Sequence, residues 1–317
     1  MRKFIFIILM GGFMNTISAT QNLSHEQRET SFETAKQALI DKIQHRGDLP
    51  HVPVEKQLQL LGELATFELG QFLIERGGLN GYWTHYVITH PKRQTTSLSS
   101  RETFLLNSAP TCLATQERFS IFKNQIQQYI QEGCSFASIP SGLMADLLDL
   151  DYSRVQTFTL NGIDLDAETL SQAKDYAKEK GLLDHCEFSE KDAWKLDINE
   201  AFDLLASNGL AIYEPDDDKV VALYRQFYNA LKPSGVLITS FLTPPPMPGL
   251  KTEWKLEFIN LENLQLQKIL FVDILDAKWQ VFRAEETVKN QLRKAGFSNI
   301  EILYDNAHIF PTVVAKK

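Results

Sequence analysis

Short apolar runs alternate with longer amphipathic stretches along the second half of the chain. Phe158–Ile163 is apolar and β-prone, as expected of a strand that is buried on both faces. The helix after it is predicted to begin at Asp166, a favourable N-cap residue, and to end at Gly181. A second short strand, Cys186–Ser189, follows directly. This alternation predicts an open α/β sheet whose neighbouring strands are parallel.

The same patterns predict the remaining elements. Further strands are expected at Ser135–Ile139, Phe202–Leu210, Val236–Leu242, Ile300–Asp305 and Phe310–Ala315, the last one inserted antiparallel. Helices are expected at Ser24–Gln44, Val54–Arg76, Thr115–Gln131, Ala284–Lys294 and after a cap at Asp216 or Asp217. The result is a seven-stranded, mostly parallel sheet with an antiparallel last strand.

Three regions follow from this reading. Residues 20–113 are expected to form a helical cap, and residues 114–317 the sheet domain. A proline-rich segment, Thr243–Gly249, is expected at the carboxyl edge of the sheet, and the stretch of about 243–276 is interpreted as an insertion over the site.

The first 19 residues allow two interpretations. Arg2 and Lys3 precede an apolar run from Phe4 to Met14, and the residues up to Ala19 resemble a signal-peptidase site. The run is too short for a stable membrane span, so no transmembrane span is expected in the mature chain. Either the protein is exported after cleavage behind Ala19, or translation starts at Met14 and the protein is cytoplasmic.

Composition narrows the classes of partner. Of the 317 residues, 44% are hydrophobic and 23% charged, and the formal net charge is −8 with no basic block. A nucleic-acid partner would normally need a Lys/Arg face, so that class is disfavoured. Three scattered cysteines without a CxxC pair are interpreted as buried thiols, and no metal site is expected.

Two acids follow successive strands. Asp164 ends the strand Phe158–Ile163, and Asp192 comes just after Cys186–Ser189. The carboxyl ends of parallel strands share the edge of the sheet where ligands bind. A carboxylate directly after a strand can accept hydrogen bonds from both ribose hydroxyls, and one on the next strand suits an adenine amino group.

These acids carry a family resemblance. GIDLD followed by a helix, then KDAW and FDLLASNGL, resembles the class I S-adenosylmethionine-dependent methyltransferases over roughly the last two-thirds of the chain. The resemblance implies a Rossmann-like fold, S-adenosylmethionine as cofactor, and methyl transfer to an O, N or C atom. It also implies that Leu165 and Ala193 form apolar walls beside the adenine.

The loop Ser138–Met144 departs from the family pattern. In the family this loop usually reads acidic-x-Gly-x-Gly-x-Gly and holds the methionine part of the cofactor. Here Ser138 replaces the acid, Pro140 the first glycine and Met144 the third, so that only Gly142 remains. Glycine lets a backbone approach a ligand closely, so the substitutions could narrow the pocket.

The acceptor side is less defined. The resemblance puts Ser207 and Asn208 near the transferred methyl group, and their SNGL context lacks the Asn-Pro-Pro-Tyr character of enzymes that methylate base amino groups. His85 is a candidate general base, and Tyr213, just after this loop, is a second catalytic candidate. For each of the candidate substrate contacts, a packing role is the first interpretation and substrate contact the second. These candidates are Tyr82, Trp83, Tyr86, Trp279 and Arg283.

Three functions compete at this point. The leading one is a methyltransferase acting on a small molecule, favoured over a protein acceptor because the cap should narrow the mouth of the site. The altered Ser138–Met144 loop motivates a catalytically inactive methyltransferase-fold module, including an exported one that acts on a host partner. A nucleotide-linked dehydrogenase is weakened because no G-x-G-x-x-G opens the first helix of the sheet.

Overall fold

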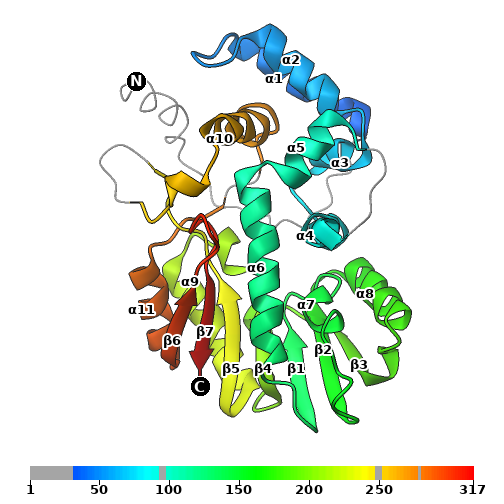
Figure 1. Ribbon diagram of the computed structural model, residues 1–317, viewed down its shortest axis with the longest axis vertical. Coiled ribbons are helices and arrows are strands. Elements are labelled where there is room, and N and C mark those ends of the chain that lie inside the picture. The colour runs from blue at the N-terminus through cyan, green and yellow to red at the C-terminus, as the bar shows by residue number, and fades with distance from the viewer. Residues whose placement is uncertain (1–30, 93–97, 247–251, 278–279) are drawn as a thin grey trace.

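The computed structural model describes residues 31–92, 98–246, 252–277 and 280–317. A seven-stranded sheet with helices on both faces forms one end of the molecule, and most of the N-terminal helices gather at the other end (Figure 1). The strands are β1 (Cys134–Ser138), β2 (Phe158–Asp164), β3 (Cys186–Glu190), β4 (Phe202–Ser207), β5 (Leu231–Ser240), β6 (Ser298–Leu303) and β7 (Thr312–Lys316).

The helices fall into two groups along the chain. Before the sheet lie α1 (Phe32–Arg46), α2 (Val54–Leu64), α3 (Glu68–Arg76), α4 (Gly81–Thr89), α5 (Ser100–Asn107) and α6 (Pro110–Gln127). Between and after the strands lie α7 (Ala145–Leu148), α8 (Ala167–Glu179), α9 (Asp217–Ala230), α10 (Leu261–Lys268), the π-helix η6 (Ile269–Ile274) and α11 (Glu285–Ala295). Short 3-10 turns are η1 (His90–Lys92), η2 (Leu183–His185), η3 (Ala193–Lys195), η4 (Ala211–Tyr213) and η5 (Leu256–Phe258).

The sheet has the strand order β3-β2-β1-β4-β5-β7-β6. The first five strands pair in parallel, and β7 runs antiparallel to both β5 and β6. The predicted fold class, with its antiparallel last strand, is therefore confirmed. The order reverses between β1 and β4, because β1 pairs with β2 on one side and β4 on the other. Such a switch point opens a crevice at the carboxyl edge of the sheet.

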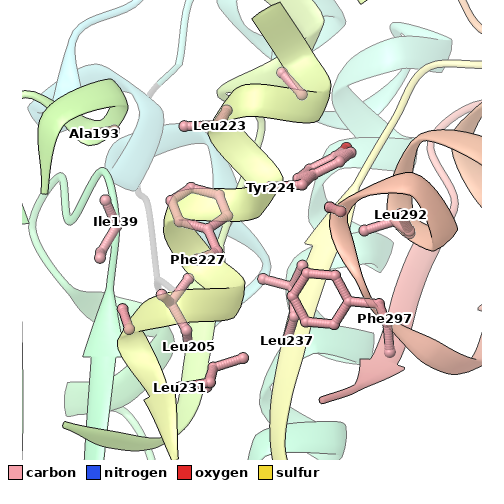
Figure 2. Close-up of a cluster of buried hydrophobic side chains, with 14 of the residues drawn as sticks. Ile139, Ala193, Leu205, Leu223, Tyr224, Phe227, Leu231, Leu237, Leu292 and Phe297 are labelled. Carbon is pink, nitrogen blue, oxygen red and sulfur yellow. The ribbon is translucent and has the colours of Figure 1, made fainter. Parts of the chain in front are cut away.

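Successive side chains of the central strands enter two different cores. In β1, Phe136 packs under α6 and α8, whereas its neighbour Ala137 faces α9 and α11. Figure 2 shows the second of these cores, in which Phe227 of α9 lies over Leu205 of β4, beside Leu237 of β5. Both faces of the strands are buried, which explains why the strands are continuous apolar runs.

The cap and the insertion after β5 share a third core. Helices α1, α2, α3 and α5 bury apolar residues against Ile269, Leu270 and Ile274 of the insertion. A buried polar cluster fastens the same contact: His51 Nε2 lies 2.7 Å from Asp273 Oδ2, and Lys268 Nζ lies 3.0 Å from the same carboxylate. Two segments far apart in sequence therefore form one helical layer.

One predicted helix is broken in two. The helix expected over Val54–Arg76 ends at Leu64 and restarts at Glu68, with Phe67 extended and buried between the halves. Gly70 makes the break possible, because a Cβ there would lie 1.9 Å from the Leu64 carbonyl oxygen. Only a glycine allows α3 to begin so close to the end of α2.

A second difference is α5, which lies partly where a polar loop is expected. Ser99 is its N-cap, and the Ser99 hydroxyl accepts a hydrogen bond from the Glu102 amide. The S-x-x-E spacing is a capping signal in a stretch with little apolar periodicity. The predicted helix over 24–44 begins, within the described residues, at Phe32.

The interpretations of residues 1–19 lie outside the described residues. Among the residues that are described, none of the helices has the length and apolar character needed to cross a membrane.

Candidate functional site

The loop after β1 is held between β4 and β2 by its backbone. The Ile139 amide donates to the Ala206 carbonyl at 2.8 Å, and the Ser141 amide donates to the Ile163 carbonyl at 2.9 Å. The Ile139–Pro140 peptide is cis, and Pro140 is half-buried. The loop therefore spans the switch point of the sheet.

Met144 takes the left-handed conformation, with φ 57°, at the position where the family pattern has its third glycine. Its side chain is fully buried in the core under α6 and α8. A Cβ added at Gly162 of β2 would lie 3.1 Å from the Met144 sulfur. The side chain of Met144 thus points into the core and does not fill the carboxyl edge, so it does not narrow that edge as the sequence suggested.

Asp164 ends β2 and is 3% exposed. Its Oδ2 accepts the Gly142 amide at 3.0 Å, and its Oδ1 accepts the Asp166 amide at 3.1 Å. Asp166 in turn caps α8 through the Glu168 amide, as predicted. The carboxylate of Asp164 therefore ties the loop after β1 to the start of α8.

Asp192 lies beyond the end of the neighbouring strand. Asp164 pairs with Glu190 in the parallel register of β2 and β3, and the Lys191 amide donates to the Asp164 carbonyl. Asp192 caps η3 by accepting the Trp194 amide at 2.9 Å, and its side chain stays partly exposed. Leu165 is 54% exposed beside Asp164, which is unusual for a large apolar residue, whereas Ala193 is buried.

Sequence reasoning missed a further acid here. Asp146 of α7 is buried, and the Ser138 hydroxyl donates to its carboxylate at 2.9 Å. Burial raises the pKa of the Asp146 carboxyl to about 6, although hydrogen bonds from Ser138 and the Leu147 amide act in the lowering direction. An acid therefore contacts the residue that replaces the acid of the family pattern. The sequence signal that could have identified Asp146 is an acid in the helix after the loop, combined with a serine at position 138 in place of the usual acid.

The loop after β4 follows the buried Ser207. The Ser207 carbonyl accepts the Thr239 hydroxyl at 3.0 Å. The side-chain oxygen of Asn208 is buried, and no described residue donates a hydrogen bond to it. Gly209 then turns the chain with φ 85°. A buried acceptor that no described residue satisfies is rare in a folded protein and calls for an explanation.

Arg118 of α6 is the main residue that sequence reasoning missed. It is 4% exposed, and within the described part of the chain its Nε and Nη1 have no hydrogen-bond acceptor. Its guanidinium carbon lies 3.6 Å from the centroid of the Phe310 ring, and a Cβ added at Gly209 would lie 3.7 Å from Nη1. Burial lowers the pKa of Arg118 to about 9, so the side chain is still charged at neutral pH. A buried charge without a partner costs several kcal/mol, roughly.

The two catalytic candidates lie in different surroundings. Tyr213 in η4 is half-buried, and burial raises its pKa, opposed by a hydrogen bond from Gln280 and by the charge of Arg118. The ring of His85 in α4 packs edge-on against Tyr176 of α8, with centroids 4.7 Å apart. Tyr213 is therefore close to Arg118, whereas the ring contact of His85 is with α8.

The aromatic residues of α4 mostly contribute to the cap. Trp83 stacks edge-on against both Tyr82 and Tyr86 and packs into the core of the cap. The Tyr86 hydroxyl donates to Glu102 at 2.9 Å, and Tyr82 is exposed. At its first residue α4 contacts α8 and the loop after β1, since a Cβ at Gly81 would lie 2.9 Å from Thr169 Cγ2 and 3.3 Å from Gly142 Cα. These placements favour packing for Trp83 and Tyr86.

Arg283 is buried, and its guanidinium is already engaged. Its Nη1 donates to the Ala211 carbonyl at 3.0 Å, its Nη2 to the Glu214 carbonyl, and its Nε to Asp217 at 2.9 Å. Arg283 thus fixes η4 and the start of α9, as its packing alternative predicts. Trp279, the other candidate from this region, lies outside the described residues.

Comparisons with known proteins bear on this arrangement. Residues 142–235 match the family described as a methyltransferase domain. A possible exported protein from Bordetella parapertussis is 40% identical, with 94% of this chain and 99% of that chain covered and a TM-score of 0.87. Magnesium protoporphyrin IX methyltransferase from Synechocystis PCC 6803, solved with bound S-adenosylhomocysteine, is 14% identical, with 75% and 94% covered and a TM-score of 0.50. No curated protein matches the chain.

The similarity to magnesium protoporphyrin IX methyltransferase, at 14% identity, is a similarity of fold. Residues 142–235 thus match a methyltransferase domain, and the strand order of the sheet agrees with a class I, Rossmann-like methyltransferase fold.

Proposed function

We propose that the protein transfers a methyl group from S-adenosylmethionine to an O, N or C atom of a small molecule. The observation that carries this proposal is that Asp164 ends β2 and Asp192 lies two residues beyond the end of the neighbouring strand β3, with the exposed Leu165 next to Asp164. A solvent-exposed leucine next to two carboxylates suits an adenosine, whose base is apolar on its faces and polar at its edge.

The residues at the carboxyl edge fit this cofactor. Each oxygen of Asp164 accepts one backbone amide, so the carboxylate is held at the end of β2, where it would also accept the ribose hydroxyls. Asp192 would accept the adenine amino group, and Leu165 and Ala193 would contact the base. The methionine end would lie along Ser138, Pro140 and Gly142, where the side chain of Met144 does not intrude.

S-adenosylmethionine, when bound, supplies a methyl group on a good leaving group. The chain has to position the acceptor atom and exclude water. Ser207, Asn208 and Tyr213 follow the end of β4, where they would contact the acceptor. Because its pKa is raised, Tyr213 is a neutral phenol at neutral pH, so it would donate a hydrogen bond and not act as a base. Ile212, Trp254 and Phe310 cover this end of the sheet, which supports a small acceptor.

Calorimetric titration with S-adenosylhomocysteine tests the cofactor half. Wild-type protein should bind it, and Leu165→Glu should weaken binding by about tenfold or more, because a second carboxylate beside Asp164 disfavours the base. Val272→Glu is the matched control, since Val272 is also 54% exposed but lies on η6 of the insertion. Equal weakening in both variants would contradict the assignment.

The inactive-module alternative is tested in the same titration. If wild-type protein gives no heat at high micromolar S-adenosylhomocysteine, the module is favoured and methyl transfer is not. Mass spectrometry of the freshly purified protein gives an independent result, because a bound product would appear as co-purified S-adenosylhomocysteine.

Export is the second part of the proposal. The 40% identical relative from Bordetella parapertussis is described as a possible exported protein, which supports the signal-peptide interpretation over a start at Met14. The intact mass of the native protein tests it. A chain that begins at Thr20 supports export, and a chain that retains Met14 contradicts it.

A further inference from the structure

Arg118 reaches the acceptor side of the site from α6. This helix runs from the cap along the sheet (Figure 1), and it is buried on more than one side. Gln116, two residues earlier, donates to the Val87 and Leu106 carbonyls and so fixes α6 against α4 and α5. The position of Arg118 is therefore set by the packing of α6 and by the Phe310 ring, and not by an ion pair with a described residue.

The guanidinium has charged neighbours but no ion-pair partner in the described part of the chain. Asp305 acts on it through space, yet the Asp305 carboxylate already accepts the amides of Ile309 at 3.1 Å and Phe310 at 2.6 Å. Tyr213 is the other titratable neighbour. The Phe310 ring covers one face of the guanidinium, which leaves its donor edge for a ligand.

The donors of Arg118 lie where an acceptor molecule would bind. Gly209, next to Nη1, directly follows Asn208, whose buried oxygen also lacks a described partner. Two unmet polar groups, one a donor and one an acceptor, thus flank the loop after β4. Around them Ile212, Trp254 and Ile309 provide apolar walls.

We propose that Arg118 binds a carboxylate of the methyl acceptor, which is therefore a small carboxylic acid with an apolar body. The planar fork of a guanidinium matches a carboxylate. We favour an acceptor with a single carboxylate, because Arg283, a second arginine at this end of the sheet, already donates to the backbone of η4 and to Asp217. This inference rests on the proposed methyl transfer, because it concerns the acceptor of that reaction.

Benzoate is the probe for the test, and benzamide is its neutral counterpart. In calorimetric titrations of the full chain with S-adenosylhomocysteine present, wild-type protein should bind benzoate at least tenfold more tightly than benzamide. Arg118→Met should weaken benzoate binding at least tenfold and change S-adenosylhomocysteine binding less than twofold. Arg118→Lys should retain part of the benzoate affinity, because it keeps the charge but not the fork.

Lys123→Met is the matched control, since Lys123 is a buried cation on the same helix that lies 3.9 Å from Asp149. It should leave benzoate binding unchanged. Arg118→Met should also raise the melting temperature, because it removes a buried charge that lacks a partner. A lowered melting temperature with unchanged benzoate binding would assign Arg118 to packing on Phe310.

The results separate the two proposals. Benzoate binding that is absent in wild-type protein, or equal in wild type and Arg118→Met, overturns the carboxylate site while the cofactor result stands. Absent S-adenosylhomocysteine binding overturns methyl transfer itself, whatever benzoate does.

Discussion

Asp164 and Arg118 lie at the same edge of the sheet, yet their polar atoms have opposite surroundings. Over β2 and β3, Asp164 accepts two backbone amides and Asp192 caps η3. Beside β4, Arg118 and Asn208 keep buried polar atoms that no described residue satisfies. The acids on the proposed cofactor side thus have hydrogen-bond donors from the backbone, whereas Arg118 and Asn208 on the proposed acceptor side keep unsatisfied atoms.

This difference predicts how each side responds to substitution. Groups on the cofactor side support both the fold and the ligand, so removing them should lower stability and affinity together. The unsatisfied groups on the proposed acceptor side lower the stability of the unliganded protein, so removing them should weaken ligand affinity but raise stability. Affinity and melting temperature measured on the same variants therefore test the comparison.

The largest effect is expected for Asp164→Ala. Hydrogen bonds to a charged group contribute about 1.5–3 kcal/mol each, so losing two ribose contacts should weaken S-adenosylhomocysteine binding by roughly 100-fold or more. The melting temperature should also fall, because the Gly142 and Asp166 amides lose their acceptor.

Asp203→Ala is the control for this variant. Asp203 also sits on a strand of the sheet, but it belongs to the start of β4 and bonds Lys232 at 2.8 Å. Calorimetry should find its cofactor affinity close to that of wild type. Equal losses in both variants would remove the argument for a ribose contact.

A smaller effect is expected for the pH dependence of stability, to which the Asp146 carboxyl contributes. Its folded-state pKa is raised to about 6 from 3.8, so the neutral carboxyl stabilises the fold below the lower value. This contribution is lost as the pH rises through about 6, and for a shift of this size the loss is about 3 kcal/mol. Melting temperatures at pH 5 and pH 8 should therefore differ less in Asp146→Asn than in wild type. An unchanged difference would mean that Asp146 does not titrate in this range.

The smallest effect is expected where the cap meets the cofactor side. Gly81→Ala puts a methyl group 2.9 Å from Thr169 Cγ2, so α4 must shift, at a cost of about 1 kcal/mol. Gly62→Ala in α2 is the control, since a methyl group there contacts nothing within 4 Å. Thermal unfolding should show a lower melting temperature for Gly81→Ala and a higher one for Gly62→Ala, because alanine favours a helix. A change in melting temperature of the same sign in both variants would mean that α4 does not pack tightly against the loop after β1.

The sheet was predictable because its signals are local. The apolar run Phe158–Ile163, the cap at Asp166 and the stop at Gly181 lie within one stretch of chain. The same holds for Asp164 at the end of β2 and for Asp192 just after β3. Two helices were predicted wrongly because apolar periodicity outweighed a local signal. The S-x-x-E cap that starts α5 lies in a polar segment without such periodicity. Gly70 lies in an apolar repeat that continues across the break between α2 and α3.

Arg118 could not be found in this way. It stands beside Phe119 on a helix whose apolar stripe predicts one buried face and one exposed face. In the folded chain α6 lies between the cap and the sheet, so Gln116, Arg118 and Lys123 are buried as well. Only the tertiary arrangement brings Arg118 next to Gly209 and Phe310, which are distant in sequence. The fold could therefore be predicted from apolar periodicity. Arg118 could not, because the periodicity of α6 gives no sign that its polar face is buried too.

The shared core of the cap and the insertion limits how this protein can be recombined with its relatives. Leu270 and Ile274, which follow β5 in the sequence, complete the hydrophobic core of the cap. A chimera that exchanged only about the first hundred residues would therefore pair the cap helices with a foreign insertion. The matching piece, with Lys268 and Asp273, would have to travel with it. A functional chimera is therefore expected to need both segments from the same parent, so that this core stays packed.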